Sequence, residues 1–290
     1  MAETFGAGTF RVALVQNCAE RDMAPSIVQL EGLIRAAAKD GADLIQLPEL
    51  ATMIEPDNAA VLAKTMPEAT DPGLAKFRAL ASELKCWIHV GSLLIRESGR
   101  DKVVNRSFML DPDGKVTARY DKIHLFDVAI KDGQSYRESA TVEPGTRAVI
   151  APLPWGRMGL TICYDLRFPH LYRALAQGGA AMIGIPAAFT HKTGEAHWHV
   201  LVRARAIETG AFVFSATQCG THAEGRRTFG HSLIVDPWGE VLADAGDTVG
   251  VVSADIDLAK VDSVRAMIPS LQHDRPFGGP VAVAARDAAE

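Results

Sequence analysis

A single cysteine, Cys163, stands where an apolar run gives way to a polar segment that begins a helix, within residues 157–169. A side chain at such a strand-to-helix turn is exposed at the carboxyl end of the strand, and the next backbone N–H groups point toward whatever it attacks. A cysteine in this position can act as a nucleophile. Taken alone, Cys163 would more often be a buried, inert side chain, because most free cysteines are of that kind. The residues that accompany it decide between these interpretations.

Two other apolar, strand-like runs end in a charged residue. Glu49 follows the run 41–48, and Lys122 closes the run 116–121. Ligands of open α/β sheets bind beyond the carboxyl ends of the strands, so we expect Glu49, Lys122 and Cys163 to converge on one pocket. A thiol, a carboxylate base and an ammonium form a set suited to acyl transfer. Taken singly, each charged residue would more often be a solvated surface group.

The three segments resemble the Glu, Lys and Cys motifs of the nitrilase superfamily of carbon-nitrogen hydrolases, in the same chain order. Glu138 follows the lysine where the amidase branches of that superfamily carry a second glutamate. The resemblance extends from about residue 10 to about residue 277, and other segments that carry it are 187–190, 193–198, 203–208 and 229–239. Several motifs in one order are far more specific than a lone cysteine.

The chemistry of amide hydrolysis suggests a role for each of these residues. A free thiol has a pKa of about 8.5, so a base must take its proton before it attacks. We expect Glu49 to be that base and Cys163 to attack the amide carbon, giving a thioester as ammonia or an amine leaves. Lys122 and the backbone N–H of Tyr164 would stabilise the oxyanion. The resemblance implies that Glu138 positions Lys122 or the scissile amide, with a surface carboxylate as its alternative.

Within the superfamily, the segments after the cysteine and near residues 193–198 and 225–232 most resemble amidases acting on deaminated glutathione or on ω-amides of α-keto acids. Such substrates are anionic. Arg167, Arg226 and Arg227 are candidates for binding a substrate carboxylate, because a guanidinium matches a carboxylate with two hydrogen bonds. Arg226 and Arg227 fit a surface loop equally well.

Several alternatives to this function stay open. Other enzymes of the superfamily are ω-amidases, hydrolases of N-carbamoyl amino acids or polyamines, and true nitrilases. A cysteine–histidine pair of the papain kind ranks lower, because the carboxylate and lysine segments already supply the required groups. Outside catalysis, the chain could be a binding protein on the same fold. The presence of Glu49, Lys122 and Cys163 together argues against that role.

Three histidines lie close together in the sequence, at residues 191, 197 and 199. His197 and His199 are poorly placed to share a metal ion, because side chains two residues apart on a helix point to different faces. Their alternative role is structural, with Thr193 capping a helix whose residues Trp198, Leu201 and Val202 pack inward. We therefore predict no metal and no cofactor.

Composition agrees with a soluble enzyme. The chain has 290 residues and is 48% hydrophobic, which is compatible with one domain over residues 1–290. We expect its core at about 10–277 and a tail at 278–290. The formal net charge of -5 and the scattered basic residues argue against nucleic acid as a partner. Without an apolar span or leader we expect no membrane association and a cytoplasmic location, which the four widely spaced cysteines also suit.

Strand and helix signals alternate along the chain. Residues 10–16 predict a buried strand, and the apolar positions from 27 to 37 predict a helix that ends near Gly41. Asp71 followed by proline predicts the start of a second helix. Proline and glycine within 108–116 and 233–241 predict two hairpins with type I turns.

An internal repeat predicts the architecture. Residues 41–48 resemble residues 179–186, and each segment follows an amphipathic helix that itself follows an apolar strand. Two such halves, each a sheet with helices on one face, would bury their free sheet faces against each other. We therefore predict an α/β fold, a four-layer α-β-β-α sandwich of two pseudo-symmetric halves. The superfamily resemblance implies the same sandwich and a homodimer or larger homo-oligomer.

Overall fold

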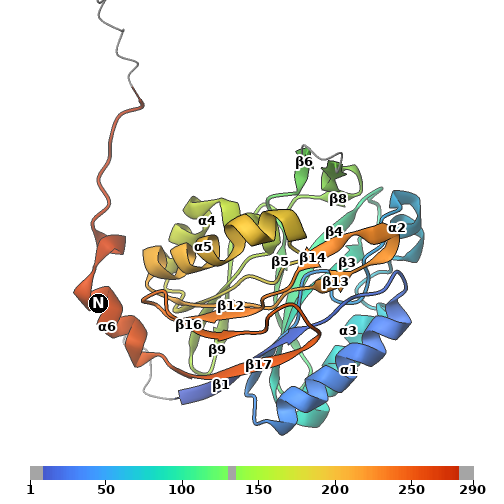
Figure 1. Ribbon diagram of the computed structural model, residues 1–290, viewed down its shortest axis with the longest axis horizontal. Coiled ribbons are helices and arrows are strands. Elements are labelled where there is room, and N and C mark those ends of the chain that lie inside the picture. Colours follow the sequence, from blue (N-terminus) through green and yellow to red (C-terminus); the bar gives the residue numbers. More distant parts are fainter. Residues whose placement is uncertain (1–8, 130–134, 281–290) are drawn as a thin grey trace, which may run out of the picture.

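Two β-sheets packed face to face form the centre of the protein, and helices cover the outer face of each sheet (Figure 1). The structure is a computed structural model that describes residues 9–129 and 135–280. The helices α1 and α3 lie on one side of the paired sheets, and α4 and α5 lie on the other (Figure 1). The predicted four-layer sandwich is therefore confirmed.

The first sheet has the strand order β17-β1-β2-β3-β4-β5, with the short β8 paired to β4. Its strands are β1 (Thr9–Gln16), β2 (Leu44–Gln46), β3 (Trp87–Arg96), β4 (Val103–Leu110), β5 (Val116–Asp121), β8 (Val142–Glu143) and β17 (Gly250–Asp257). The outer face is covered by α1 (Met23–Lys39) and α3 (Pro72–Leu84). Since β1, β2 and β3 are parallel, their carboxyl ends open at one edge of the sheet.

The second sheet has the order β16-β15-β12-β11-β10-β9. Its strands are β9 (Val149–Leu153), β10 (Gly156–Leu160), β11 (Met182–Gly184), β12 (Phe212–Ser215), β15 (Leu233–Val235) and β16 (Val241–Asp244). The helices α4 (Pro169–Gln177) and α5 (His191–Thr209) cover its outer face. The other elements are α2 (Asn58–Lys64), α6 (Ala259–Met267), the strand pairs β6 (Asp127–Ala129) with β7 (Ser135–Arg137) and β13 (Cys219–Thr221) with β14 (Arg227–Phe229), and the short 3-10 helices η1 (Glu138–Ala140), η2 (Cys163–Arg167), η3 (Ala223–Gly225) and η4 (Ser270–Gln272).

The two halves of the chain repeat the same order of elements and the same backbone hydrogen bonds, as the internal repeat predicts. In the first half β1 leads through α1 into β2, and the N–H of Asp43 donates to the carbonyl of Arg11 at 2.9 Å. In the second half β10 leads through α4 into β11, and the N–H of Ala181 donates to the carbonyl of Arg157 at 2.9 Å. Each unit then pairs in parallel with a third strand, β3 or β12. The two halves thus bring equivalent strand ends to the same region.

Side chains of β1 show how the layers are held together. Phe10, Val12 and Leu14 belong to the core between the two sheets, whereas Ala13 and Val15 pack in the core beneath α1 and α3. Successive side chains of a strand point to opposite faces, so an apolar residue at nearly every position is what a strand buried on both faces requires. The buried strand predicted for residues 10–16 is confirmed, and it begins one residue earlier, at Thr9.

Most of the other predicted elements are confirmed. The helix expected to end near Gly41 ends at Lys39. Asp71 caps α3, because its carboxylate accepts a hydrogen bond from the N–H of Leu74 at 2.8 Å. Both hairpins form, and in each the glycine N–H donates to the carbonyl of the first turn residue, from Gly114 to Asp111 and from Gly239 to Asp236.

The predicted cap of the histidine-rich helix is wrong. α5 begins at His191, its N-cap residue is Thr190, and Thr193 lies inside the first turn, where its hydroxyl contacts Thr190. The reason is that the chain leaves the sheet in an extended conformation only as far as Thr190, which also pairs with β14. Trp198 and Val202 are buried as expected, and Leu201 is half-buried.

Two expectations concern the ends of the chain and membranes. The start of the chain, residues 1–8, and most of the expected tail, residues 281–290, lie outside the described residues. Among the described helices, none combines the length and the apolar character that a membrane crossing needs.

Candidate active site

Glu49 lies three residues beyond the end of β2 and is almost completely buried, with 3% of its surface exposed. One carboxylate oxygen accepts hydrogen bonds from Lys122 Nζ at 2.8 Å and Asn105 Nδ2 at 3.1 Å. The other accepts from the backbone N–H of Ala188 at 2.8 Å. The carboxylate is therefore fixed in one orientation by both halves of the molecule.

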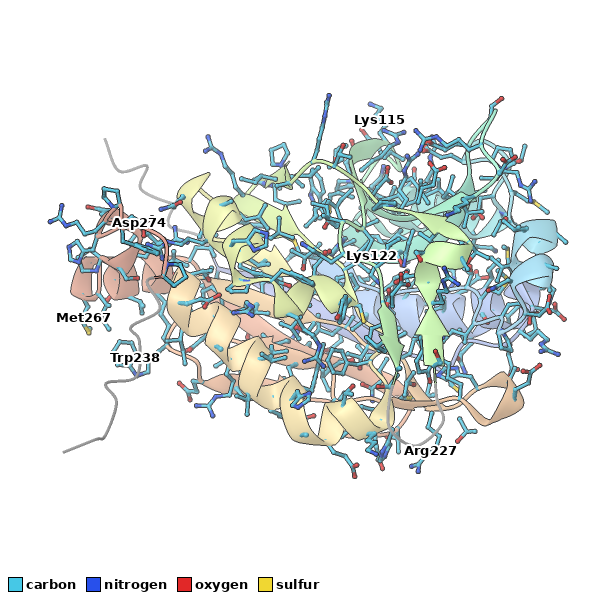
Figure 2. All side chains as sticks on the ribbon, turned by 90° about the horizontal axis from the view of Figure 1, so that it is seen from above. Lys115, Lys122, Arg227, Trp238, Met267 and Asp274 are labelled. Atoms are coloured by element: carbon cyan, nitrogen blue, oxygen red, sulfur yellow. The ribbon has the colours of Figure 1, made fainter. Side chains whose placement is uncertain are left out.

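Lys122 follows β5 and is buried among carboxylates near the centre of the molecule (Figure 2). Besides Glu49, its ammonium donates to both oxygens of Glu138, at 2.8 and 3.1 Å. Glu138 opens η1 and also accepts from the N–H of Phe126 at 2.7 Å. The predicted second glutamate thus lies against the predicted lysine.

Cys163 is the first residue of η2, at the turn between β10 and α4 where the sequence predicts it. Its φ of 47° is left-handed, which is uncommon for a residue other than glycine and is found at strained functional positions. Its N–H donates to the carbonyl of Pro186 at 2.9 Å, and its thiol hydrogen-bonds to the Glu49 carboxylate. The turn therefore aims the thiol at the carboxylate.

Two buried polar residues that the sequence analysis missed hold this arrangement. Asn105, in the middle of β4, donates to Glu49 and, at 3.2 Å, to Glu138, so it bridges the two carboxylates. Asp165 accepts hydrogen bonds from the N–H of Ile162, from the hydroxyl of Tyr120 and from the N–H and ring of His124. It thereby joins the cysteine turn to the chain on either side of Lys122. In the sequence, each of the two is a polar residue that lies inside an apolar run or directly after one. That pattern could have identified both as candidates.

The charges of the cluster set its resting protonation state. Burial raises the pKa of Glu49, but the charge and hydrogen bond of Lys122, together with the hydrogen bonds of Cys163 and Ala188, outweigh it, and the net pKa lies below its ordinary value. Burial lowers the pKa of Lys122, but the charges of Glu138 and Glu49 outweigh it and hold the pKa above its ordinary value. Burial and the charge of Glu49 raise the pKa of the Cys163 thiol. The cluster thus rests as a thiol, a carboxylate and an ammonium.

A cavity of about 600 Å³ opens over these groups. Glu49, Lys122, Glu138, Cys163 and Tyr164 all line it, together with the aromatic residues Phe126, Tyr136 and Phe189. Among the described residues that line the cavity there is no histidine, and the group beside the thiol that could exchange a proton with it is the Glu49 carboxylate. The arrangement can take a proton from the thiol and stabilise negative charge on a substrate oxygen, which is what acyl transfer needs.

Of the three arginines proposed for substrate binding, the structure brings one to the cavity. Arg226 lines it, with its guanidinium 5.5 Å from the centre of the Tyr136 ring. Its buried Nε has no hydrogen-bond partner among the described residues. Arg167 lies outside the described lining, where it contacts His197 and packs over the ring of Phe189.

Arg227 is exposed on β14 and points to the margin of the molecule (Figure 2). It lies outside the described cavity lining, next in sequence to a residue that belongs to it. Since successive side chains of an extended segment point to opposite sides, only one of the two neighbouring arginines can face the cavity.

Gly91 makes the position of Glu49 sensitive to a small substitution. A Cβ at residue 91 would lie 2.0 Å from the carbonyl oxygen of Leu47 and 2.3 Å from that of Pro48, in the segment that leads into Glu49. We expect Gly91→Ala to lower the free energy of unfolding by about 1–3 kcal/mol, because the backbone must move. The same movement would displace Glu49, so kcat should fall as well. Urea denaturation measures the first effect and steady-state kinetics the second.

Gly32, inside α1, provides the matched control. A Cβ there meets nothing within 4 Å, so Gly32→Ala should leave kcat unchanged and raise stability by up to about 1 kcal/mol. Equal stability and kcat for Gly91→Ala and the wild type would show that this close approach does not position Glu49.

The fold and the cavity together define a class of protein. It is a layered α/β protein in which a thiol, a carboxylate and an ammonium face one cavity.

Comparison with known proteins identifies the family to which such a protein belongs. Residues 11–266 match the carbon-nitrogen hydrolase family. The chain is 41% identical to a deaminated glutathione amidase of Yersinia enterocolitica over 267 residues, 91% of this chain and 92% of the relative. It is 40% identical to the human deaminated glutathione amidase over 272 residues, 91% of this chain and 82% of the relative.

A solved structure is also similar. The crystal structure of Saccharomyces cerevisiae Nit3, a member of branch 10 of the nitrilase superfamily, superimposes with a TM-score of 0.83 at 27% identity, covering 92% of this chain and 97% of Nit3. The chain belongs to the carbon-nitrogen hydrolase family, and the predicted resemblance to the nitrilase superfamily is confirmed. It is therefore an enzyme that hydrolyses carbon–nitrogen bonds.

Proposed function

We propose that this enzyme is a cysteine-dependent amidase that hydrolyses a small anionic amide such as deaminated glutathione. The observation that carries the proposal is the meeting of the Cys163 thiol, the Glu49 carboxylate and the Lys122 ammonium in one cavity. The substrate follows from the names of the relatives, which are deaminated glutathione amidases at about 40% identity over most of their length. The candidate substrates differ in the nitrogen compound that each would release, and this difference can be measured.

In the first half of the reaction, Glu49 takes the proton of Cys163 as the sulfur attacks the carbonyl carbon of the amide. Negative charge then develops on the carbonyl oxygen, and Lys122 together with the backbone N–H of Tyr164 stabilises it. Glu49 returns its proton to the departing nitrogen as the carbon–nitrogen bond breaks, which leaves a thioester on Cys163. The hydrogen bonds of Glu138 hold the Lys122 ammonium in place throughout.

In the second half, Glu49 takes a proton from water, which attacks the thioester. The same two donors stabilise the new oxyanion, and the proton on Glu49 goes to the departing sulfur as the free acid leaves. The resting protonation state suits both halves. A carboxylate with a lowered pKa is ionised at neutral pH, and a thiol with a raised pKa becomes nucleophilic only when that carboxylate takes its proton.

Arg226 is proposed to bind the carboxylate of the substrate. We expect Arg226→Met to raise KM for an anionic amide by about 10- to 100-fold, because a hydrogen bond to a charged group contributes about 1.5–3 kcal/mol. KM for a neutral amide of similar size should stay within about 2-fold on the same grounds. Steady-state kinetics on the two substrates measures both.

Arg227→Met is the control, since that neighbouring side chain is exposed outside the cavity lining. It should leave both KM values unchanged. An equal loss with the anionic and the neutral substrate in Arg226→Met would mean that the arginine supports the cavity wall and does not recognise charge. Arg167 stays a candidate that acts through the Phe189 ring, against which it packs.

A substrate panel tests the proposed activity against its alternatives. Deaminated glutathione would release a dipeptide amine, α-ketoglutaramate would release ammonia, and an N-carbamoyl amino acid would release ammonia with carbon dioxide. A simple nitrile completes the panel. Release of the amine by the wild type and not by Cys163→Ala is the expected result. Turnover of α-ketoglutaramate alone would make the enzyme an ω-amidase, and no cysteine-dependent turnover of any compound would favour a binding role.

We further propose that residues 1–290 form one domain with its core at about 10–277. We also propose that the enzyme works in the cytoplasm as a homodimer or larger homo-oligomer on a small amide substrate, without a nucleic acid or membrane partner. Four unpaired cysteines suit a reducing compartment. Large apolar side chains are exposed on the segments near α6, among them Trp238 and Met267, at 53% and 65% (Figure 2). Such residues fit a subunit contact. Analytical ultracentrifugation at micromolar concentration tests this, and a monomer would contradict it.

A further inference from the structure

Outside the active site, two histidines and an aspartate from three separate segments of the chain converge on one point. His199 comes from the middle of α5, His231 precedes β15, and Asp244 ends β16. Their ligand atoms all lie within 4.8 Å of one another. We propose that this cluster is a binding site for a divalent transition-metal ion such as Zn²⁺, Ni²⁺ or Co²⁺.

The donor set and its spacing fit such an ion. His199 Nε2 lies 3.0 Å from Asp244 Oδ2, and His231 Nδ1 lies 2.9 and 3.1 Å from the two oxygens of the same carboxylate. An ion with ligands at about 2.0–2.1 Å in tetrahedral geometry spaces its ligand atoms about 3.3 Å apart, so small side-chain rotations are enough. Imidazole nitrogens with one carboxylate suit zinc, nickel and cobalt better than calcium or magnesium.

Besides these rotations, binding requires a change of tautomer at the histidines. The contacts with Asp244 are made by the same ring nitrogens that would hold the ion, and these carry the protons while no ion is bound. On binding, each neutral imidazole moves its proton to its other nitrogen and gives the freed lone pair to the metal. The three side chains are 27–38% exposed, so water can reach the remaining coordination positions.

The backbone around the cluster holds the ligands in place. His231 has a left-handed φ of 56°, and its N–H donates to the carbonyl of Gly246 at 2.6 Å. Its carbonyl accepts from the indole N–H of the buried Trp198, at 2.8 Å. The N–H of Gly246 donates to Asp244 at 2.9 Å. Such outer hydrogen bonds orient metal ligands and strengthen binding.

This site is separate from the cavity, because none of its three ligands is among the residues that line it. An ion there would tie α5 to the hairpin of β15 and β16. The ring of Phe229 stacks on His231, and the N–H of Phe229 donates to the carbonyl of Phe189, a lining residue. Because the three ligands lie outside the cavity and join α5 to the hairpin, the role inferred for the ion is structural. No step of amide hydrolysis uses it.

Isothermal titration with ZnCl₂ tests the proposal in the Cys163→Ala protein, in which the active-site thiol cannot bind the metal. We expect one equivalent of Zn²⁺ to bind. Affinity should fall at least roughly 10-fold in His231→Asn and in His199→Gln, each made in that background. Asparagine tolerates a left-handed φ, and the side chain of His199 is 38% exposed, so neither change should disturb folding. The melting temperature of each metal-free variant checks this.

His197→Gln is the matched control, since His197 lies two residues away on the same helix and outside the cluster. Its affinity for Zn²⁺ should be unchanged. The absorption spectrum of the Co²⁺ complex provides an independent test, because nitrogen and oxygen ligands give visible bands without the near-ultraviolet band of a thiolate. A thiolate band, unchanged affinity in His199→Gln, or no binding at all would overturn the proposal.

Discussion

Replacing Cys163 with alanine is expected to lower kcat for the amide substrate by at least about 10⁴-fold, the scale of loss seen when a nucleophile is removed from a hydrolase that works through a covalent intermediate. In the proposed mechanism Glu49 and Lys122 act on a reaction that begins with the sulfur, and the described lining of the cavity holds no second cysteine to replace it. The measurement is kcat by product release, with binding of the amide to the inactive variant measured separately.

Cys86→Ala is the control for this variant. Cys86 is also a buried, unpaired thiol, but it packs in the core beneath α1 and α3. Replacing Cys86 with alanine should lower the free energy of unfolding and leave kcat unchanged. If Cys163→Ala kept more than about one tenth of the wild-type kcat, the loss would be far smaller than removal of a nucleophile causes, and Cys163 would have to be structural.

Replacing Lys122 with methionine should have the largest effect on stability. The ammonium is the cation between two carboxylates, and without it Glu49 stays buried with no opposite charge beside it. Removing one partner of a buried ion pair costs about 3–5 kcal/mol. We expect a loss of that size in urea denaturation at pH 7, together with loss of activity.

The pH dependence of stability should distinguish this cause from simple loss of packing. In the wild type the pKa of Glu49 is lowered, so its contribution to stability is lost only as the pH falls through that lowered pKa. In Lys122→Met the burial that raises this pKa is no longer opposed by the ammonium. The carboxylate then binds its proton more readily in the folded state than in the unfolded one, and the penalty is relieved as the pH falls. The stability gap between the two proteins should therefore narrow from about pH 7 to about pH 4.

Lys115→Met serves as the matched control, because Lys115 lies on the surface of the β4–β5 hairpin, with 73% of its side chain exposed (Figure 2). Its effect on stability should stay within about 0.5 kcal/mol at every pH. A gap between Lys122→Met and the wild type that is constant with pH would contradict the electrostatic explanation.

The candidate site could be predicted from the sequence where strand ends determine it. Glu49 follows β2 in the first half and Cys163 follows β10 in the second, and each of these strands has a parallel neighbour in its sheet, β1 or β11. The carboxyl ends of such strands are where ligands of α/β sheets bind. Lys122 reaches the same place from the end of an antiparallel strand, β5, which the periodicity alone does not predict. Lys122 was expected there because it closes an apolar, strand-like run, and the superfamily resemblance supported that expectation.

Other parts of the site could not be predicted, because they depend on pairing across the sheets. Asn105 is one polar residue in an apolar strand, and its partners, Glu49 and Glu138, are known only once three separate segments are packed together. The two neighbouring arginines are a different case. The alternation of side chains along an extended segment predicts that Arg226 and Arg227 point apart, although it does not say which of them faces the cavity.

The histidines show the limit of reasoning from local spacing. His197 and His199 were correctly expected to point to different faces of a helix, and His199 meets His231 and Asp244, which lie 32 and 45 residues further along the chain. Only the packing of α5 against the hairpin of β15 and β16 brings these residues together. The pair considered from local spacing is therefore not the pair of histidines that the fold brings together.

Mass spectrometry of the protein, quenched with acid during turnover of deaminated glutathione, tests the central claim most directly. We predict that part of the protein gains the mass of the substrate minus that of the released amine, and that the added group lies on the peptide containing Cys163. Mild hydroxylamine should remove it, as expected for a thioester. An acyl group on any other residue, or a first turnover at the wild-type rate after Cys163 has been alkylated, would contradict the account.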